Sequence, residues 1–355
     1  MDIDNMFETM IEKNSSDLFI RAGSPLKARI DNKVTSIGDR EIKLEEVNNL
    51  IKKLPDTQAK EDLKSKKNCE FTLWYKGDWR FRISIFFQRN TPAIVIRKIN
   101  LKFNSFKELN LPAEILTNLS NQRRGMVLLT GATGSGKSTT IATMLEYINN
   151  NLGYHILTIE EPVEFTFKDN QSIINQREIG KDVRNYQEAL KQFALHSPDV
   201  IFIGNIRDAE TCYAALTAAE TGVLVFSTIH TINASSTIQR IINFFPPHQH
   251  NLIISQLSTL LKGVVSQRLL PRKDQGLIPA YESMVLSPSI SRLIRENKIW
   301  EIPKYIASGD IYGMRTFNQS LLELVESNKI TSQTALEYSD QREDLEIELR
   351  NKNLI

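Results

Sequence analysis

A phosphate-binding loop is the first feature of this chain with a definite chemistry. The stretch from Gly131 to Ser138 fits the pattern G-x-x-x-x-G-K-[ST]. In such loops the backbone N–H groups face phosphate oxygens, the lysine adds a positive charge at the β- and γ-phosphates, and the hydroxyl is a ligand of Mg²⁺. We expect a nucleoside triphosphate to bind these residues, with Ser138 as the metal ligand: Gly131, Ala132, Thr133, Gly134, Ser135, Gly136, Lys137, Ser138 and Thr139.

Polar residues follow three short apolar runs further along the chain, and these runs read as strands: 155–159, 199–203 and 222–228. Glu160 and Glu161 follow the first run, Asn205 follows the second and His230 follows the third. Strands that alternate with helical patterns are typical of a parallel α/β sheet, in which ligands gather at the carboxyl ends of the strands. These four residues are therefore candidates for chemistry.

The phosphate loop has the flanking elements that its motif requires. Residues 126–129 before it are a continuous apolar run, as in a buried strand. Apolar residues after it recur at helical spacing: Ile141, Met144, Leu145 and Ile148. Beyond Pro246 a second helical spacing is formed by Leu257, Leu260, Leu261, Val264 and Val265. We expect the remainder of the chain to be mostly helical.

The N-terminal part of the chain carries two arginines on one face of an expected strand. Residues 70–75 and 79–87 are β-rich runs, joined by the short Gly-containing hairpin signal Lys76, Gly77 and Asp78. In the second run the apolar face is expected to consist of Phe81, Ile83, Ile85 and Phe87. Because successive side chains of a strand alternate, Arg80 and Arg82 share the opposite face.

The charge balance and the cysteines exclude several classes of protein. Lys and Arg total 44 against 42 Asp and Glu, and a net charge of +2 argues against nucleic acid as a partner. Cys69 and Cys212 have no metal-ligand or disulfide spacing, which is typical of a reducing cytoplasm. The acidic N-terminus has no signal-peptide pattern, and no apolar run has the length that crosses a bilayer. We expect a cytoplasmic protein of two or three domains.

Four segments together resemble the ordered Walker A, Asp-box, Walker B and His-box motifs of the secretion ATPase superfamily: 131–138, 158–165, 198–211 and 227–231. Flanking segments narrow the resemblance to the pilus-retraction (twitching-motility) ATPase family of PilT and PilU: 16–20, 80–82, 240–246 and 314–321. The likeness covers nearly the whole chain. Residues 175–178 and 339–345 favour the PilU branch.

The resemblance implies a fold, an assembly and a set of partners. It implies an α/β protein with an N-terminal PAS-like α+β domain, a linker, a RecA-like P-loop NTPase core and a helical C-terminal region, at 1–101, 102–112, 113–272 and 273–355. It further implies a homo-hexamer that uses ATP and Mg²⁺ to move an inner-membrane pilus platform protein, with a paralogous retraction ATPase as a second candidate partner. The chain would then be peripheral to the inner membrane through its partners.

The resemblance also assigns roles to five residues. Glu160 occupies the place of the acidic residue that positions or activates the attacking water. His230 stands where the family senses the γ-phosphate. Arg80 and Arg82 would reach a nucleotide, across the subunit boundary, as arginine fingers. Asn205 stands where the family normally has the Walker B glutamate.

Asn205 is the departure that matters most for catalysis. Asn cannot accept a proton and carries no negative charge, and loss of a general base typically slows a reaction about a hundred- to ten-thousandfold. Leu195 lies in the stretch where the family often has an arginine shortly before Walker B. Two interpretations therefore remain: an ATPase that hydrolyses ATP at an ordinary rate, and one that is slow or traps its nucleotide.

Three alternatives to a pilus-retraction motor remain open from the sequence. The first is a non-catalytic or accessory nucleotide-binding subunit of a retraction motor, which Asn205 and Leu195 motivate. The second is a type IVB secretion ATPase. The third, a DNA-translocating motor, has only the fold and scattered basic residues in its favour. Members that drive extension or type II secretion usually carry a tetracysteine zinc insert, which two distant cysteines cannot form, so the retraction side is favoured.

Overall fold

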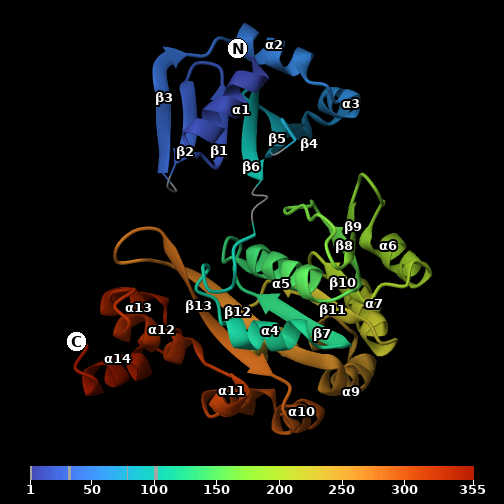
Figure 1. Cartoon of the computed structure of the whole chain (residues 1–355), viewed down its shortest axis with the longest axis vertical. Helices are drawn as coiled ribbons and strands as arrows, with labels where there is room; N and C mark the ends of the chain where they lie inside the picture. Colours follow the sequence, from blue (N-terminus) through green and yellow to red (C-terminus); the bar gives the residue numbers. More distant parts are fainter. Residues whose placement is uncertain (1, 31–32, 78, 100–102) are drawn as a thin grey trace. The chain divides into compact units, whose positions relative to one another are not determined.

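The structure, a computed structural model, describes residues 2–30, 33–77, 79–99 and 103–355 (Figure 1). The chain forms two compact units, Met1–Lys102 and Phe103–Ile355, and each is built on its own β-sheet. Asp78 of the predicted hairpin turn lies outside the described residues, as do residues 100–102 around the start of the predicted linker.

The first unit is a six-stranded antiparallel sheet with helices packed on it. Its strands are β1 (Asp17–Arg21), β2 (Pro25–Ile30), β3 (Lys33–Glu41), β4 (Asn68–Tyr75), β5 (Trp79–Gln88) and β6 (Thr91–Ile99), in the order β3-β2-β1-β6-β5-β4. The helices are α1 (Ile3–Glu12), α2 (Leu44–Lys53) and α3 (Thr57–Lys66). Apolar residues of the helices, among them Phe7, Val47 and Leu63, form one core with the strands.

The predicted hairpin of the first unit is present as strands β4 and β5. They pair antiparallel, and Phe81, Ile83 and Ile85 are buried in the core as their alternation predicts. Phe87 differs from the prediction, because it lies close to the end of β5, where its ring is 37% exposed and Lys67 Nζ stands 5.1 Å from its centre.

The second unit is a seven-stranded sheet that is parallel except at one edge. Its strands are β7 (Gly125–Thr130), β8 (His155–Glu160), β9 (Ile173–Glu178), β10 (Val200–Ile203), β11 (Leu224–Ile229), β12 (Leu261–Pro271) and β13 (Leu277–Val285). The order is β13-β12-β7-β11-β10-β8-β9, and only β13 pairs antiparallel with its neighbour. The predicted parallel α/β sheet is therefore confirmed.

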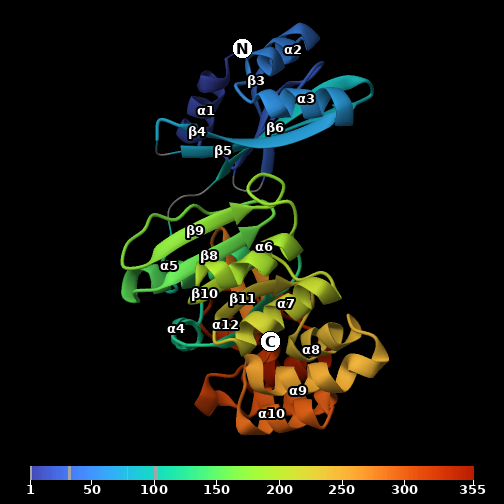
Figure 2. The ribbon, with the colours of Figure 1, turned by 90° about the vertical axis from the view of Figure 1, so that its right-hand side faces the viewer.

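Helices cover both faces of this sheet (Figure 2). Those up to α9 are α4 (Ala113–Ser120), α5 (Lys137–Asn151), α6 (Tyr186–Gln192), α7 (Ala209–Glu220), α8 (Ala234–Asn243) and α9 (His250–Leu260). The later ones are α10 (Pro288–Arg295), α11 (Ile302–Ala307), α12 (Phe317–Glu326), α13 (Ser332–Tyr338) and α14 (Arg342–Asn351). Short 3-10 turns lie at Phe193–His196, Pro247–Gln249, Ile299–Glu301 and Asp310–Tyr312.

Alternate residues of the central strands belong to two separate cores. In β7, Met126 and Leu128 pack on the face covered by α7, α8 and α9, while Val127 and Leu129 pack on the face covered by α4 and α5. This explains why residues 126–129 form a continuous apolar run, because a strand that is buried on both faces has no solvent-facing side. Phe106 and Leu111, from the stretch predicted as a linker, are buried in the core with α4 and α5.

The predicted helical spacing through Leu261, Val264 and Val265 was wrong. Helix α9 ends at Leu260, and Leu261–Pro271 is strand β12, which pairs with β7 on one side and β13 on the other. The apolar residues 264 and 265 are adjacent because the two faces of β12 are both buried, and a helix and a doubly buried strand produce similar short apolar runs. The following region is mostly helical, as predicted, apart from β13.

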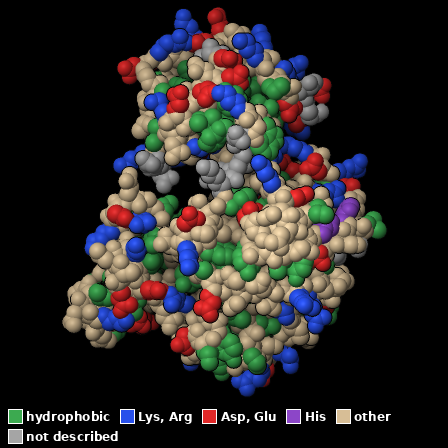
Figure 3. All heavy atoms as spheres, viewed as in Figure 1, with side chains coloured by type: hydrophobic (Ala, Val, Ile, Leu, Met, Phe, Trp, Pro, Cys, Tyr) green, Lys and Arg blue, Asp and Glu red, His purple; other side chains and the backbone are tan. Residues whose placement is uncertain are grey.

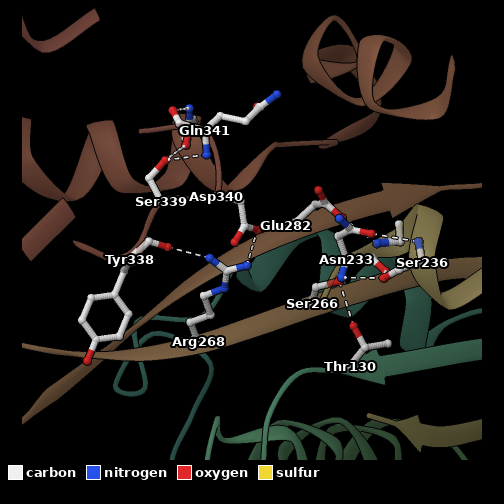
Figure 4. A network of polar contacts seen from close by, with 12 residues as sticks. Thr130, Asn233, Ser236, Ser266, Arg268, Glu282, Tyr338, Ser339, Asp340 and Gln341 are labelled. Atoms are coloured by element: carbon white, nitrogen blue, oxygen red, sulfur yellow. Dashed lines mark hydrogen bonds and ion pairs between the residues drawn. The ribbon is translucent and has the colours of Figure 1, made fainter. Parts of the chain in front are cut away.

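Arg268 of β12 makes polar contacts with the C-terminal helical region (Figure 4), which also packs on β12 and β13 through an apolar core. The Arg268 guanidinium donates a hydrogen bond to the backbone oxygen of Tyr338 at 2.5 Å and forms an ion pair with Asp340. It also lies 4.1 Å above the ring of Phe317, the first residue of α12. The contacts join both ends of the α12–α13 segment to the sheet.

Charges of both signs are mixed on the face of the molecule that Figure 3 shows. On the face shown in Figure 3, Lys and Arg side chains lie among Asp and Glu side chains, in line with the net charge of +2. Among the described helices, none has both the length and the apolar character that a bilayer-spanning helix needs.

Candidate active site

The phosphate loop lies between β7 and α5, as its motif predicts. Gly131, Gly134 and Gly136 all have positive φ, at 139°, 79° and 93°. A Cβ on Gly131 would stand 2.4 Å from the backbone oxygen of Gln267, so this position has no room for a side chain. The loop therefore needs glycine both for its turns and for its close approach to β12.

Lys137, the first residue of α5, folds back over the loop. Its Nζ donates hydrogen bonds to the backbone oxygens of Gly131 at 2.9 Å and Ala132 at 2.8 Å. Burial lowers the pKa of Lys137, while the charge of Glu164 acts in the opposite direction. A positive charge is thus held at the N-terminus of a 15-residue helix, where the helix dipole also favours an anion.

Glu160 is the last residue of β8 and is only 6% exposed. Its Oε1 accepts hydrogen bonds from Thr158 Oγ1 at 2.7 Å and from Gln176 Nε2 at 3.3 Å. Burial nevertheless raises the pKa of Glu160 to about 7, because the charged form is poorly solvated there. A carboxylate with this pKa is suited to accept a proton near neutral pH.

The carboxyl ends of the neighbouring strands are tied together by hydrogen bonds. Thr228 Oγ1 of β11 donates to the backbone oxygen of Gly204 at 2.6 Å, and the Gly204 N–H donates to the backbone oxygen of Ile159 at 2.8 Å. Asn205 follows directly and is 8% exposed, and its Oδ1 has no hydrogen-bond partner among the described residues. The chain thus holds Asn205 close to the end of β8.

His230 follows β11 and lies beside the phosphate loop. Burial and the positive charge of Lys137 lower the pKa of His230, whereas a hydrogen bond with the backbone of Gly131 acts in the opposite direction. The lowered pKa makes the imidazole neutral at pH 7. A neutral ring has one N–H, and the hydrogen bond with the Gly131 backbone uses it.

The structure brings four of the predicted site residues to one small cavity. Ser138, Glu160, Glu161 and Asn205 line it, at the carboxyl ends of β8 and β10. Arg207 Nη1 stands 3.3 Å from Glu161 Oε2 on the same lining. The clustering follows from the parallel order of the strands, since their carboxyl ends share one edge.

Two residues of this region were missed as site candidates from the sequence. Gln176 holds Glu160 from β9, but the stretch Ile173–Glu178 is too polar to show the alternation of a strand. Tyr186 lines the cavity from the start of α6, and no motif marks a single tyrosine there. Only the packing of α6 against the strand ends reveals it.

Arg80 and Arg82 lie in the first unit, on the face of β5 opposite its buried residues. Arg80 Nη2 donates a hydrogen bond to Thr72 Oγ1 at 3.2 Å, and its guanidinium lies 5.6 Å from the ring centre of Trp74. Arg82 forms an ion pair with Glu70 at 2.6 Å. Their shared face is as the alternation predicts, and their role toward a nucleotide stays a prediction.

The residues of the cavity fit Mg²⁺ better than a metal held by the protein alone. In the part of the chain that the structure describes, no three His, Cys, Asp or Glu side chains gather as a metal cage. Mg²⁺ usually keeps several waters and takes one or two protein ligands together with substrate phosphates. The Ser138 hydroxyl, beside the unpartnered oxygen of Asn205, meets that requirement.

The sheet and the loop define a P-loop ATPase with a RecA-like second unit. A sequence profile of the Type II/IV secretion system protein family matches residues 1–349, and the chain belongs to this family. The type IV pilus ATPase PilU of Pseudomonas aeruginosa is 36% identical over 351 residues, which cover 99% of this chain and 92% of PilU. The type IV pilus retraction ATPase PilT of the same organism is 38% identical over 337 residues, or 95% and 98% of the two chains.

Solved structures agree with this assignment. The crystal structure of the pilus retraction motor PilT with bound ADP matches with a TM-score of 0.91 at 38% identity, covering 98% of this chain and 99% of PilT. The ATPase DotB of Legionella pneumophila matches with a TM-score of 0.81 at 24% identity, covering 94% of each chain, and shares the fold. The identities to PilU and PilT are too similar to separate the two branches.

Proposed function

We propose that this chain is a motor ATPase that powers type IV pilus retraction. The proposal is carried by the phosphate loop and its neighbours Glu160, Asn205 and His230, in a chain that matches PilT and PilU along nearly its whole length. DotB shares only the fold at 24% identity, so we favour a pilus over a type IVB secretion context.

In this function the loop binds the phosphates of ATP. The backbone N–H groups at the start of α5 face them, and Lys137 adds its charge close by. Mg²⁺, when bound, neutralises phosphate charge, and the Ser138 hydroxyl would be its protein ligand. His230 would transfer its N–H hydrogen bond from the Gly131 backbone to the γ-phosphate and so report whether that group is present.

Glu160 is the general base of the proposed reaction. It accepts a proton from a water molecule, whose oxygen bonds to the γ-phosphorus. The bond from this phosphorus to the β–γ bridging oxygen breaks, which yields ADP and inorganic phosphate. Asn205 accepts a hydrogen bond from the same water through Oδ1, so it orients the water without taking its proton.

The motor is proposed to act as a homo-hexamer on an inner-membrane pilus platform protein. Arg80 and Arg82 would supply positive charge to the nucleotide of a neighbouring subunit, where a planar guanidinium binds phosphate oxygens in pairs. The chain would then be cytoplasmic and reach the inner membrane only through its partners, which include a paralogous retraction ATPase in some assemblies.

Steady-state phosphate release by the purified full-length oligomer tests this function. The natural protein is compared with Glu160→Gln, with Lys137→Ala and with Glu220→Gln, which removes an exposed carboxylate of α7 as a control. We expect Glu160→Gln to lower kcat about a hundredfold or more while ADP still binds, and Lys137→Ala to abolish binding. Turnover by Glu160→Gln at the natural rate would contradict the proposed base.

A second function, an accessory nucleotide-binding subunit, is favoured by two specific observations. Asn205 offers no carboxylate, and Leu195 is an apolar residue, 83% exposed, in the stretch where a charge is expected. In that case the natural protein binds ATP without turnover, and Asn205→Glu restores hydrolysis. Sustained turnover by the pure natural protein would exclude this second function.

A further inference from the structure

The cavity beside the phosphate loop has the size of a water site. Its volume is about 60 Å³, which is room for water molecules but much less than a nucleotide pocket needs. Its polar lining includes Ser138, Glu160, Asn205, Arg207 and the hydroxyl-bearing ring of Tyr186. A cavity of this size and polarity is where folded proteins hold ordered water.

Asn205 lines this cavity, and its side-chain oxygen is a hydrogen-bond acceptor without a donor in the part of the chain that the structure describes. The residue is only 8% exposed, its Oδ1 is buried, and none of the described residues donates a hydrogen bond to that oxygen. Buried polar atoms are nearly always satisfied, either by the protein or by ordered water. A water molecule in the cavity can donate one hydrogen to Asn205 and the other to Glu160.

Tyr186 supplies the donor that such a water still lacks. Its hydroxyl oxygen lies 3.2 Å from the point where a Cβ would stand on Gly204, so the missing side chain at 204 lets the phenol approach the strand ends. Burial and then the charge of Glu161 raise the pKa of Tyr186 to about 12, so the hydroxyl keeps its proton at neutral pH. No described residue accepts a hydrogen bond from it.

We propose that Tyr186 is a positioning residue for hydrolysis, whose hydroxyl donates a hydrogen bond to the water held by Asn205 and Glu160. Three fixed partners define the orientation of one water molecule, with a remaining lone pair directed at the γ-phosphate. The pair Tyr186 and Asn205 then replaces the orienting part of a Walker B glutamate, while Glu160 alone takes the proton. The inference rests on the proposed ATPase function.

The test uses kcat, KM and ADP affinity of the full-length oligomer carrying Tyr186→Phe. The control is Tyr154→Phe, which removes a hydroxyl from a partly buried tyrosine of the same unit outside the cavity. We expect Tyr186→Phe to lower kcat about five- to tenfold, the effect of one hydrogen bond, with KM, ADP affinity and melting temperature unchanged. Tyr154→Phe should leave kcat unchanged.

A double variant separates positioning from a merely structural role. If Tyr186 and Asn205 orient the same water, Asn205→Ala combined with Tyr186→Phe lowers kcat by less than the product of the two single losses. Independent losses, or a Tyr186→Phe variant with the natural kcat, overturn the inference while the ATPase function stands. A natural protein that never hydrolyses ATP overturns both.

Discussion

Glu160 can act as a base only in its ionised form, and its burial at the end of β8 makes that form scarce at acidic pH. The raised pKa of about 7 has one dominant cause, desolvation, which the hydrogen bonds from Thr158 and Gln176 only partly offset. Glu161 and Glu164 line the same cavity, and Asn205 adds no further negative charge to it. One carboxylate next to another would be harder to ionise.

We therefore expect kcat to fall as pH drops below about 7 and to be level above it, because protonated Glu160 cannot take a proton from water. In Asn205→Glu the midpoint should move to higher pH, since a further carboxylate then joins Glu160, Glu161 and Glu164 on the lining of one cavity. Phosphate release measured from about pH 6 to about pH 9 checks both expectations. An unchanged midpoint in Asn205→Glu would argue against the charge coupling.

The phosphate loop and the C-terminal helices show how single elements are held by their neighbours. The loop packs closely on β12, where the backbone oxygen of Gln267 leaves no space for a side chain at Gly131. At Gly134, by contrast, a Cβ would meet no atom within 4 Å. Both positions have positive φ, but only at Gly131 does a neighbouring atom also exclude a side chain.

Gly131→Ala should destabilise the protein by about 3 kcal/mol, because its Cβ collides with backbone that cannot move away. Gly134→Ala should cost only about 1 kcal/mol, the strain of a left-handed backbone. Urea unfolding without nucleotide measures both differences in the free energy of unfolding. Equal costs would mean that the approach of β12 to the loop is unimportant.

Arg268→Met should destabilise the packing of the C-terminal helices by about 2 kcal/mol, because it removes a charged donor to Tyr338 and a cation above Phe317. Asp340→Asn is the matched variant, and we expect it to cost less than about 1 kcal/mol since the Asp340 side chain is half exposed. The measurement is the free energy of unfolding of the two variants. If Asp340→Asn lost more stability than Arg268→Met, the ion pair would be the contact that stabilises this packing.

At the scale of the whole molecule, activity should depend on assembly. The net charge is only +2, from 44 Lys and Arg against 42 Asp and Glu, so long-range repulsion between copies of the chain is weak. The arginines of β5 and the phosphate loop belong to different compact units. In a site that a neighbouring subunit completes, one chain would supply the phosphate loop and the other the two arginines.

Mixing two inactive variants tests completion in trans. Arg80→Ala with Arg82→Ala in one chain, and Lys137→Ala in the other, should each be inactive alone. Mixed oligomers should recover part of the turnover, because some intact loops then face intact arginines. Arg40→Ala, which removes an exposed arginine of the same unit, should be fully active alone. Mixtures that stay inactive would place the arginines outside the reaction.

The sequence alone determined the phosphate loop, the parallel sheet and the family, since these depend on local patterns: a glycine spacing, apolar runs of strand length and ordered motifs. It could not determine whether a short apolar run that is buried on both faces forms a helix or a strand. Leu261–Pro271 is a strand because it forms backbone hydrogen bonds with β7 on one side and β13 on the other. Tertiary structure alone also joined Glu160 to Gln176 and brought Tyr186 to Asn205. These contacts link different helices and strands, and the burial that sets the pKa of Glu160 exists only once these elements have packed.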